Sequence, residues 1–160
     1  ILSTEHGPWS GDEINKIIFN KNYGWPISSY GERYGEELYP LSTYGEKFSE
    51  KGNLTPTYHK NHYSLDFEEP IFSFVPALGI SEIIKLPNNF SNFWIDNFII
   101  SSLWGQSLHR IKFDENYNKV ILNEKIFIGG RIRDLEYHNK MNAILLSLEQ
   151  TGELGIITKE

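Results

Sequence analysis

A hairpin-like pattern that recurs about 45 residues apart constrains the fold of this chain most strongly. Pairs of apolar runs are separated by short polar turns, and these runs lie at residues 97–103, 107–113, 142–148 and 154–159. A further strand candidate precedes each pair, at residues 79–86 and 132–137. Sets of three or four short strands with such a period are typical of propeller blades. We therefore predict an all-β fold built from blades.

The opening of the chain resembles a third hairpin, with strands at residues 1–5 and 13–19. The first blade lacks an opening strand and the last ends after its third strand. Residues 1–160 are therefore expected to form one unit, a segment of about three blades of a β-propeller. A β-sandwich is the alternative, because short strands separated by turns also fit that architecture.

Residues 20–63 form the irregular part of the chain, in which glycines alternate with aromatic residues. A flexible linker would be rich in Gly and Ser without the rings. This composition instead favours a compact, aromatic-rich, ordered loop.

The predicted blades do not close into a ring within 160 residues, and so few blades are not expected to be stable alone. The chain also opens on an apolar pair without a starting Met, so we expect a fragment of something longer. Either the missing half lies elsewhere, or a second copy of the chain supplies it. A homodimer of two half-propellers would cover the open sheet edges.

Charge and composition exclude several classes of partner. The net charge of −6 argues against nucleic acid, which requires clustered Lys and Arg. No apolar stretch is long enough to span a membrane. The chain has no cysteine, which excludes disulfides, thiolate metal sites and a Cys nucleophile.

The turn between the first two predicted strands carries more polar chemistry than a turn needs. Pro8 lacks an N–H, and Gly7 can reach conformations closed to other residues, so their carbonyl oxygens are expected outside the strand ladder. Such oxygens are good calcium ligands, and Asp12 could orient the ligand or the loop. The alternative is an ordinary polar turn in which Asp12 caps the chain where the next strand begins.

Two arginines near the C-terminus form the second candidate site. Arg131 and Arg133 would point to the same face of a strand, with Asp134 on the opposite face. Because their charges repel, a polycarboxylate or phosphate ligand could lie between them. Acidic residues of a neighbouring blade are the alternative partners.

The histidines point to no recognisable catalytic motif. His6 lies in the polar turn and is a candidate site residue, whereas His109 is expected to be structural. His59 and His62 have a spacing that could hold a metal, but no third ligand is near in sequence, so exposure is expected. No Ser-His-Asp order, Walker loop or dinucleotide fingerprint is present.

Four motifs carry a family resemblance over essentially the whole chain: "STEHGPWSGDEIN", "KNYGWPISSYG", "SLHRIKF" and "RIRDL". In this order they resemble the C-terminal half of the soluble sugar dehydrogenases that depend on pyrroloquinoline quinone (PQQ), the glucose/sorbosone dehydrogenase family. The resemblance implies the last three blades of a six-bladed propeller, in a protein exported to the periplasm or secreted.

The resemblance also implies roles for particular residues. The carbonyls of Gly7 and Pro8 would bind a calcium ion beside the quinone, with Asp12 close to both. Arg131 and Arg133 would grip the quinone carboxylates. A basic residue of well-studied members is replaced by Trp104 in this sequence.

The family oxidises an aldose at its anomeric carbon, with a histidine as base and the quinone as hydride acceptor. That histidine lies in the N-terminal half of family members, so the resemblance assigns no catalytic residue to this chain. The sequence therefore predicts part of a PQQ- and calcium-dependent sugar dehydrogenase. The alternative is a non-catalytic propeller module that binds carbohydrate or protein.

Overall fold

The computed structural model describes residues 1–32 and 58–159, and within them it is all-β. The first sheet contains β1 (Leu2–Glu5), β2 (Asp12–Lys16) and β3 (Phe72–Phe74). The second contains β4 (Ile80–Lys85), β5 (Asn97–Ser102), β6 (Ser107–Phe113) and β7 (Val120–Phe127). The third contains β8 (Ile132–His138), β9 (Ala143–Leu148) and β10 (Leu154–Thr158). A single 3-10 turn, Tyr63–Leu65, is the helical element of the described residues.

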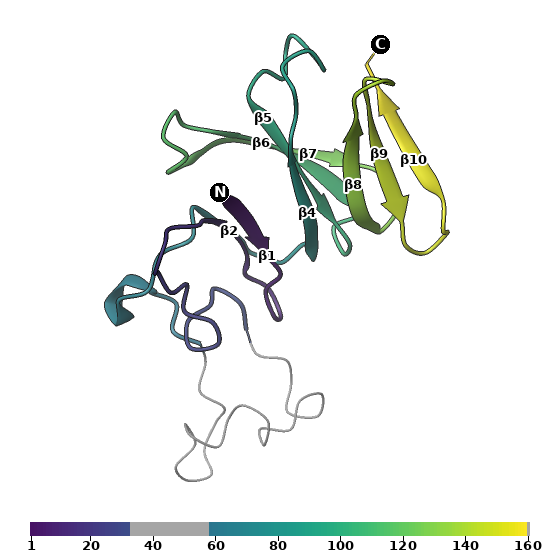
Figure 1. The fold of residues 1–160 in the computed structure, drawn as a ribbon. Helices are drawn as coiled ribbons and strands as arrows, with labels where there is room; N and C mark the ends of the chain where they lie inside the picture. The colour runs from purple at the N-terminus through teal and green to yellow at the C-terminus, as the bar shows by residue number, and fades with distance from the viewer. Residues whose placement is uncertain (33–57, 160) are drawn as a thin grey trace.

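The three sheets follow one another through the molecule, with the four-stranded sheet in the middle (Figure 1). Each is an antiparallel meander in which neighbours in sequence are neighbours in space. Strand β4 contacts both β1 and β8, so the opening strand of the middle sheet lies between its two neighbours. Sheets arranged in this series are blades of a propeller and not the two facing layers of a sandwich.

Within the middle sheet, β5 is buried on both faces and has no exposed residue. Ile99 belongs to one apolar core, which packs against Ile132 and Ile144 of the third sheet. Its neighbours Phe98 and Ile100 belong to a second core, which lies against the first sheet. Successive side chains of a strand point to opposite faces, so one strand supplies both cores.

The repeated hairpins predicted from the sequence are confirmed as β5–β6 and β9–β10, with β4 and β8 preceding them. The second strand of the opening hairpin ends at Lys16, earlier than predicted. The reason is Tyr23, whose hydroxyl donates to Lys16 O and accepts from the Ile18 N–H, drawing the chain out of the sheet.

Two strands were not predicted. Strand β7 is largely exposed and shows no clear apolar alternation, although it completes the middle sheet. Strand β3 has only three residues and is defined by pairing with β2. Both depend on a partner strand more than on their own sequence pattern.

Most of the irregular region predicted at residues 20–63 lies outside the described residues, which leave out 33–57. Its two described ends pair with each other, because His59 N–H donates to Ile27 O and Ser29 N–H donates to His59 O. The rings of Trp25 and Tyr58 also pack together, with centroids 5.4 Å apart. These ends lie beside the first sheet (Figure 1).

Candidate functional site

Five strand connections gather at one end of the sheets, and we call this end the rim. The rim comprises residues 6–11, 75–79, 103–106, 128–131 and 149–153. Successive strands of an antiparallel meander run in opposite directions. The start of β4, the connection from β5 to β6 and the end of β7 therefore lie at the same end of the middle sheet. Backbone hydrogen bonds join the connections in series: Gly11 N–H to Phe74 O, Gly105 N–H to Leu78 O, and Gly129 N–H to Gln106 O. The residues predicted to bind cofactor or metal all lie in the rim or next to it.

A tightly curled loop between β1 and β2 carries Gly7 and Pro8. Ser10 and Gly11 have positive φ angles of 96° and 74°, which turn the chain back on itself. A Cβ atom on Gly7 would lie 2.3 Å from the Ser10 carbonyl oxygen, a distance that backbone atoms cannot accommodate. Only glycine therefore fits at position 7.

Asp12 is fully buried at the start of β2 and holds this loop from behind. Its Oδ1 atom accepts from the Gly7 N–H at 2.8 Å. Its Oδ2 atom accepts from the N–H groups of Leu78 at 2.7 Å and Ile80 at 3.1 Å. One carboxylate thus ties the Gly7 loop to the segment that opens the middle sheet, and it orients the loop through backbone donors.

A pocket of about 260 Å³ lies against the Gly7 loop. It is lined by Glu5, His6, Gly7, Pro8, Gly11, Glu13, Tyr23, Trp25, Ser28 and Ser29. These residues carry two carboxyl groups and three hydroxyls in addition to their backbone carbonyls, and such oxygens are the ligands that a hard cation such as calcium takes. This donor set fits the predicted metal. Within residues 1–32 and 58–159, no group of three His, Cys, Asp or Glu side chains could hold a metal ion, so backbone oxygens would be needed.

The arginine pair shares one acidic partner, Glu149. Arg131 Nε lies 3.2 Å from Glu149 Oε2, and Arg133 Nη2 lies 2.9 Å from Oε1. The sequence left two alternatives open for what lies between the arginines, an anionic ligand or acidic residues of a neighbouring blade, and the second placed the acid on another blade. That expectation is wrong, because Glu149 follows β9, which pairs with the arginines' own strand. Asp134 instead accepts from the Leu135 N–H.

Trp104 stands on the rim between the two candidate sites, with 76% of its surface exposed. Trp104 is close to Gly79 and His6. A Cβ atom placed on Gly79 would lie 3.3 Å from the Trp104 backbone nitrogen and 3.3 Å from the His6 ring. An exposed indole presents an apolar face and a single N–H donor. Trp104 therefore brings no positive charge to the place where the resemblance implies a basic side chain.

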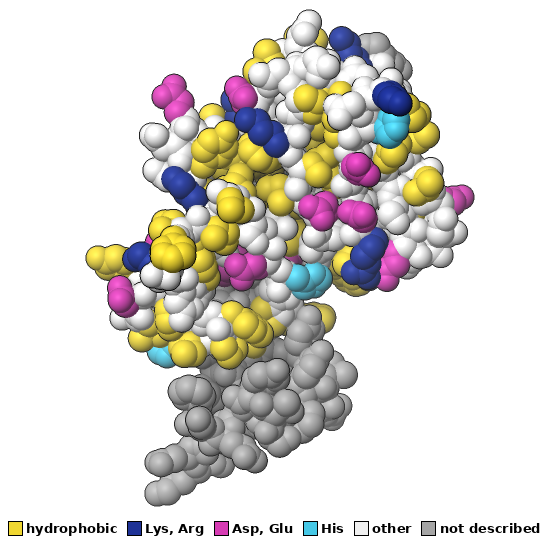
Figure 2. All heavy atoms as spheres, viewed as in Figure 1, with side chains coloured by type: hydrophobic (Ala, Val, Ile, Leu, Met, Phe, Trp, Pro, Cys, Tyr) yellow, Lys and Arg dark blue, Asp and Glu magenta, His cyan; other side chains and the backbone are white. Residues whose placement is uncertain are grey.

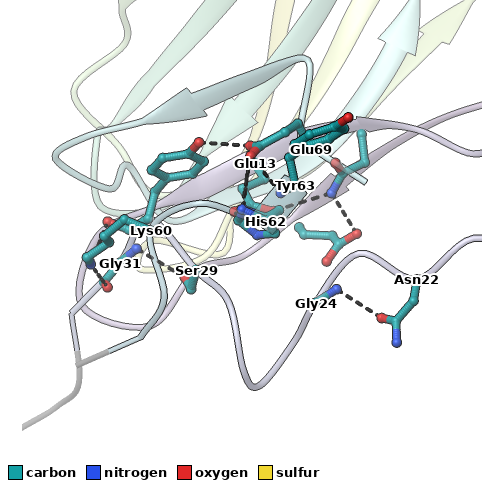
Figure 3. Close-up of polar contacts among 12 residues, drawn as sticks. Glu13, Asn22, Gly24, Ser29, Gly31, Lys60, His62, Tyr63 and Glu69 are labelled. Atoms are coloured by element: carbon teal, nitrogen blue, oxygen red, sulfur yellow. Dashed lines mark hydrogen bonds and ion pairs between the residues drawn. The ribbon is translucent and has the colours of Figure 1, made fainter. Parts of the chain in front are cut away.

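The expectation that His62 is exposed is wrong, since its side chain has no accessible surface. Figure 3 shows His62 between the carboxylates of Glu13 and Glu69. Its Nε2 atom lies 3.7 Å from Glu13 Oε1, and its Nδ1 atom lies 3.6 Å from Glu69 Oε2. The Tyr30 ring packs on the imidazole with centroids 5.3 Å apart. His62 therefore fills the space between the aromatic-rich loop and β2, while His59 is exposed.

Burial controls the protonation of this cluster. It raises the pKa of Glu13 from 4.5 to about 7, with only partial compensation from the hydrogen bond of Asn15. It also lowers the pKa of His62, against the opposing effect of Glu69. Below pH 7 the fold thus favours a neutral imidazole beside a protonated carboxyl, and Glu13 begins to ionise near neutral pH.

The other two histidines discussed above have assigned surroundings. His6 Nδ1 lies 3.3 Å from Ile80 O on the rim. His109 is buried in β6, and its Nδ1 atom lies 2.7 Å from the Asn123 side-chain oxygen. Its packing against the Phe74 ring makes it part of the core, as predicted.

Exposed apolar side chains gather over the segments that flank residues 33–57, as the lower part of the described surface shows (Figure 2). The exposed members in these segments are Ile17, Ile18, Phe19, Trp25, Ile27, Tyr63 and Leu65. Within the described residues, no helix has the length and hydropathy that crossing a membrane would require.

The sequence pattern of the glucose/sorbosone dehydrogenase family matches residues 1–156. The chain belongs to this family. Among curated members it is 28% identical over 152 residues to the aldose sugar dehydrogenase YliI of Escherichia coli. That match covers 94% of this chain and 36% of YliI, so the chain spans about a third of its relative's length.

Solved structures of glucose/sorbosone dehydrogenase type share the fold. A glucose dehydrogenase superposes with a TM-score of 0.73 at 24% identity, covering 100% of this chain and 40% of the other. The soluble aldose sugar dehydrogenase (Asd) of Escherichia coli, in its apo-form, gives 0.69 at 22% identity, covering 99% of this chain and 41% of the other. The prediction of a partial propeller is confirmed.

Sequence reasoning missed Glu149 as the partner of the arginines, and it missed the contact between Glu13 and His62. Glu13 directly follows Asp12, so its neighbour was a usable signal. Nothing in the local sequence shows that His62 is buried or that Glu149 contacts the arginines. Glu13 lies 49 positions from His62, and Arg131 lies 18 positions from Glu149.

Proposed function

We propose that this chain supplies part of the quinone and calcium site of a PQQ-dependent sugar dehydrogenase. The observation that carries the proposal is the rim, where a pocket beside Gly7 and Pro8 and the paired Arg131 and Arg133 lie at the same end of the first and third sheets, on either side of the middle sheet. Family membership supports the sugar dehydrogenase part of this proposal.

In this proposal the carbonyl oxygens of Gly7 and Pro8 hold calcium, and Asp12 fixes the loop that presents them. Arg131 and Arg133 bind carboxylates of PQQ through charge-assisted hydrogen bonds. When bound, PQQ would supply the electron sink for oxidation of an aldose, and calcium would act as a Lewis acid on the quinone. We assign no catalytic base to this chain. The residues here bind and orient.

The test adds PQQ and calcium to the full-length protein and follows quinone absorbance and thermal unfolding. A ligand at a hundredfold its dissociation constant should stabilise the fold by about 2.7 kcal/mol. Arg131→Ala should weaken PQQ binding while barely changing the free energy of unfolding. No absorbance change and no thermal shift would count against the proposal, and a loss of several kcal/mol in Arg131→Ala would make that arginine structural.

A non-catalytic propeller module that binds carbohydrate or protein is the second candidate. Trp104 favours it, because an exposed indole stands where the family resemblance implies a basic residue and cannot pair with a quinone oxygen as lysine would. Sugar-dependent reduction of an artificial electron acceptor, measured with PQQ and calcium present, separates the two. Sugar binding without turnover would support the module.

We further propose that additional blades cover the edge strands β1 and β10. Strand β10 exposes Leu154 by 78% and Ile156 by 55%, and edge strands of this kind invite pairing. The blades would come from the rest of a longer protein or from a second copy of the chain. Sedimentation distinguishes these, since a strictly monomeric species of residues 1–160 would contradict the homodimer. A periplasmic or secreted location, also proposed, is testable by cell fractionation.

A further inference from the structure

Glu149 joins the two arginines through both its side chain and its backbone. Each carboxylate oxygen takes a different arginine, with Arg131 at 3.2 Å and Arg133 at 2.9 Å. The Glu149 N–H also donates to Arg131 O at 2.9 Å. The turn after β9 is therefore fixed to the start of β8, which keeps the Glu149 backbone beside the arginines.

The neighbouring strand positions explain why the arginines need such an acid. Ile132 between them is completely buried in the core, whereas the side chains of both arginines reach the same carboxylate, that of Glu149. Two like charges on one face repel, and two long side chains have many rotamers. A carboxylate that contacts both holds them parallel and lowers their repulsion.

The pair keeps binding capacity after this contact. Each guanidinium has five N–H donors, and within the described residues Arg131 engages Glu149 through Nε and Arg133 through Nη2. Two positive charges and one negative charge leave one net positive charge. Hydrogen bonding by Arg133 and then Arg131 lowers the pKa of Glu149, so the acid stays ionised at neutral pH.

We propose that Glu149 is a positioning residue for anion recognition, which holds Arg131 and Arg133 in the arrangement that receives a ligand bearing carboxylates. The inference rests on the proposed function for the identity of that ligand as PQQ, but the geometry of the arginines does not depend on it. The opposite role is that of a competitor, in which Glu149 occupies the arginines and must be displaced. The two roles predict opposite effects of its removal.

The experiment compares the full-length protein with Glu149→Gln, Glu149→Asp and the matched control Glu124→Gln. Glu124 forms a similar pair with Arg110 at 2.6 Å, between β6 and β7, so its loss changes net charge equally. The dissociation constant of PQQ is measured by fluorescence quenching with calcium present. The Nε–H signals of Arg131 and Arg133 are followed by NMR, with and without phthalate as a simple dicarboxylate probe.

A positioning role predicts that Glu149→Gln weakens PQQ binding at least tenfold despite the added positive charge. Glu149→Asp should recover part of the loss, and Glu124→Gln should change binding less than twofold. Both arginine Nε–H signals should broaden or shift in Glu149→Gln alone. Unchanged or tighter PQQ binding in Glu149→Gln would overturn the proposal.

Failure of the proposed function gives a different result. If the unmodified protein binds no PQQ, but phthalate shifts both arginine signals in it and not in Glu149→Gln, the quinone assignment falls and the positioning role stands. If phthalate shifts neither arginine, or shifts them equally in both proteins, the positioning role is wrong.

Discussion

The imidazole of His62 and the carboxyl group of Glu13 face each other inside the protein, with Nε2 3.7 Å from Oε1. Neither atom has a hydrogen-bond partner among the described residues. Burial penalises the ionised form of each group, so ionising either one alone should cost stability. The contact joins the aromatic-rich loop to β2, so its protonation should affect stability.

The first prediction concerns the pH dependence of that stability. The pKa of Glu13 rises from 4.5 to about 7 on folding, so the folded state binds more protons between these values. In the calcium-free protein, the contribution of Glu13 to the free energy of unfolding should therefore fall as pH rises through this window, whereas the lowered pKa of His62 acts in the opposite direction. The loss should approach about 3 kcal/mol, and Glu13→Gln should abolish it. Urea unfolding from pH 5 to 9 measures the effect.

The control for this prediction is Glu136→Gln, which makes the same chemical change at an exposed position of β8. Its pH profile should match that of the unmodified protein. Parallel profiles for Glu13→Gln and the unmodified protein would show that Glu13 does not titrate in this window.

The second prediction concerns Asp12, which accepts three backbone N–H groups. Asn at this position has only one side-chain oxygen to accept these hydrogen bonds, and its amide N–H₂ would face at least one backbone N–H donor. Asp12→Asn should therefore lower the free energy of unfolding by about 3 kcal/mol, measured by urea denaturation. Asp134→Asn, at an exposed position with one backbone donor, should cost far less. Equal losses would mean that the three contacts do not contribute as proposed.

The third prediction concerns the shape of the loop that carries Gly7. Gly7→Ala would place a Cβ atom 2.3 Å from Ser10 O, so the loop must change shape. We expect a loss of about 2 kcal/mol or more in stability and loss of calcium binding by calorimetry. Gly130→Ala is the control, since its Cβ atom would approach no atom closer than 3.4 Å. Full calcium affinity in Gly7→Ala would exclude this loop as the metal site.

The fourth prediction tests the replacement at Trp104. Trp104→Lys restores the charge that the family resemblance implies, and should tighten PQQ binding about tenfold, as one charge-assisted hydrogen bond would. Because the side chain is 76% exposed, stability should change by less than about 0.5 kcal/mol. Phe93→Lys adds the same charge at a highly exposed position between β4 and β5. Equal tightening in both variants would indicate a general charge effect.

Much of the fold was predictable because local sequence patterns indicate its strands and hairpins. The strands β5 and β9 are continuous apolar runs, and the hairpins around them repeat. Strand β7 was missed because its side chains are mostly exposed, so burial left no pattern in its sequence. Its place in the sheet depends on pairing with β6.

The candidate site divides in the same way. The unusual chemistry of the loop at Gly7 and the shared face of Arg131 and Arg133 follow from residue types and strand geometry. The acid between the arginines does not, since Glu149 reaches them through the pairing of β8 with β9. The burial of His62 was equally invisible in a polar stretch, because Tyr30, Glu13 and Glu69 enclose it from other parts of the chain.

By itself, the sequence determined that the chain forms short strands in repeated blades, and that a Gly-Pro loop and an arginine pair carry its candidate chemistry. Those properties depend on periodicity and backbone freedom, which are local. Tertiary structure alone decided that the loop and the arginines lie on one rim, that Asp12 anchors the loop, and that Glu149 bridges the arginines. These relationships join residues brought together by the meander of each sheet and by the packing of one sheet on the next.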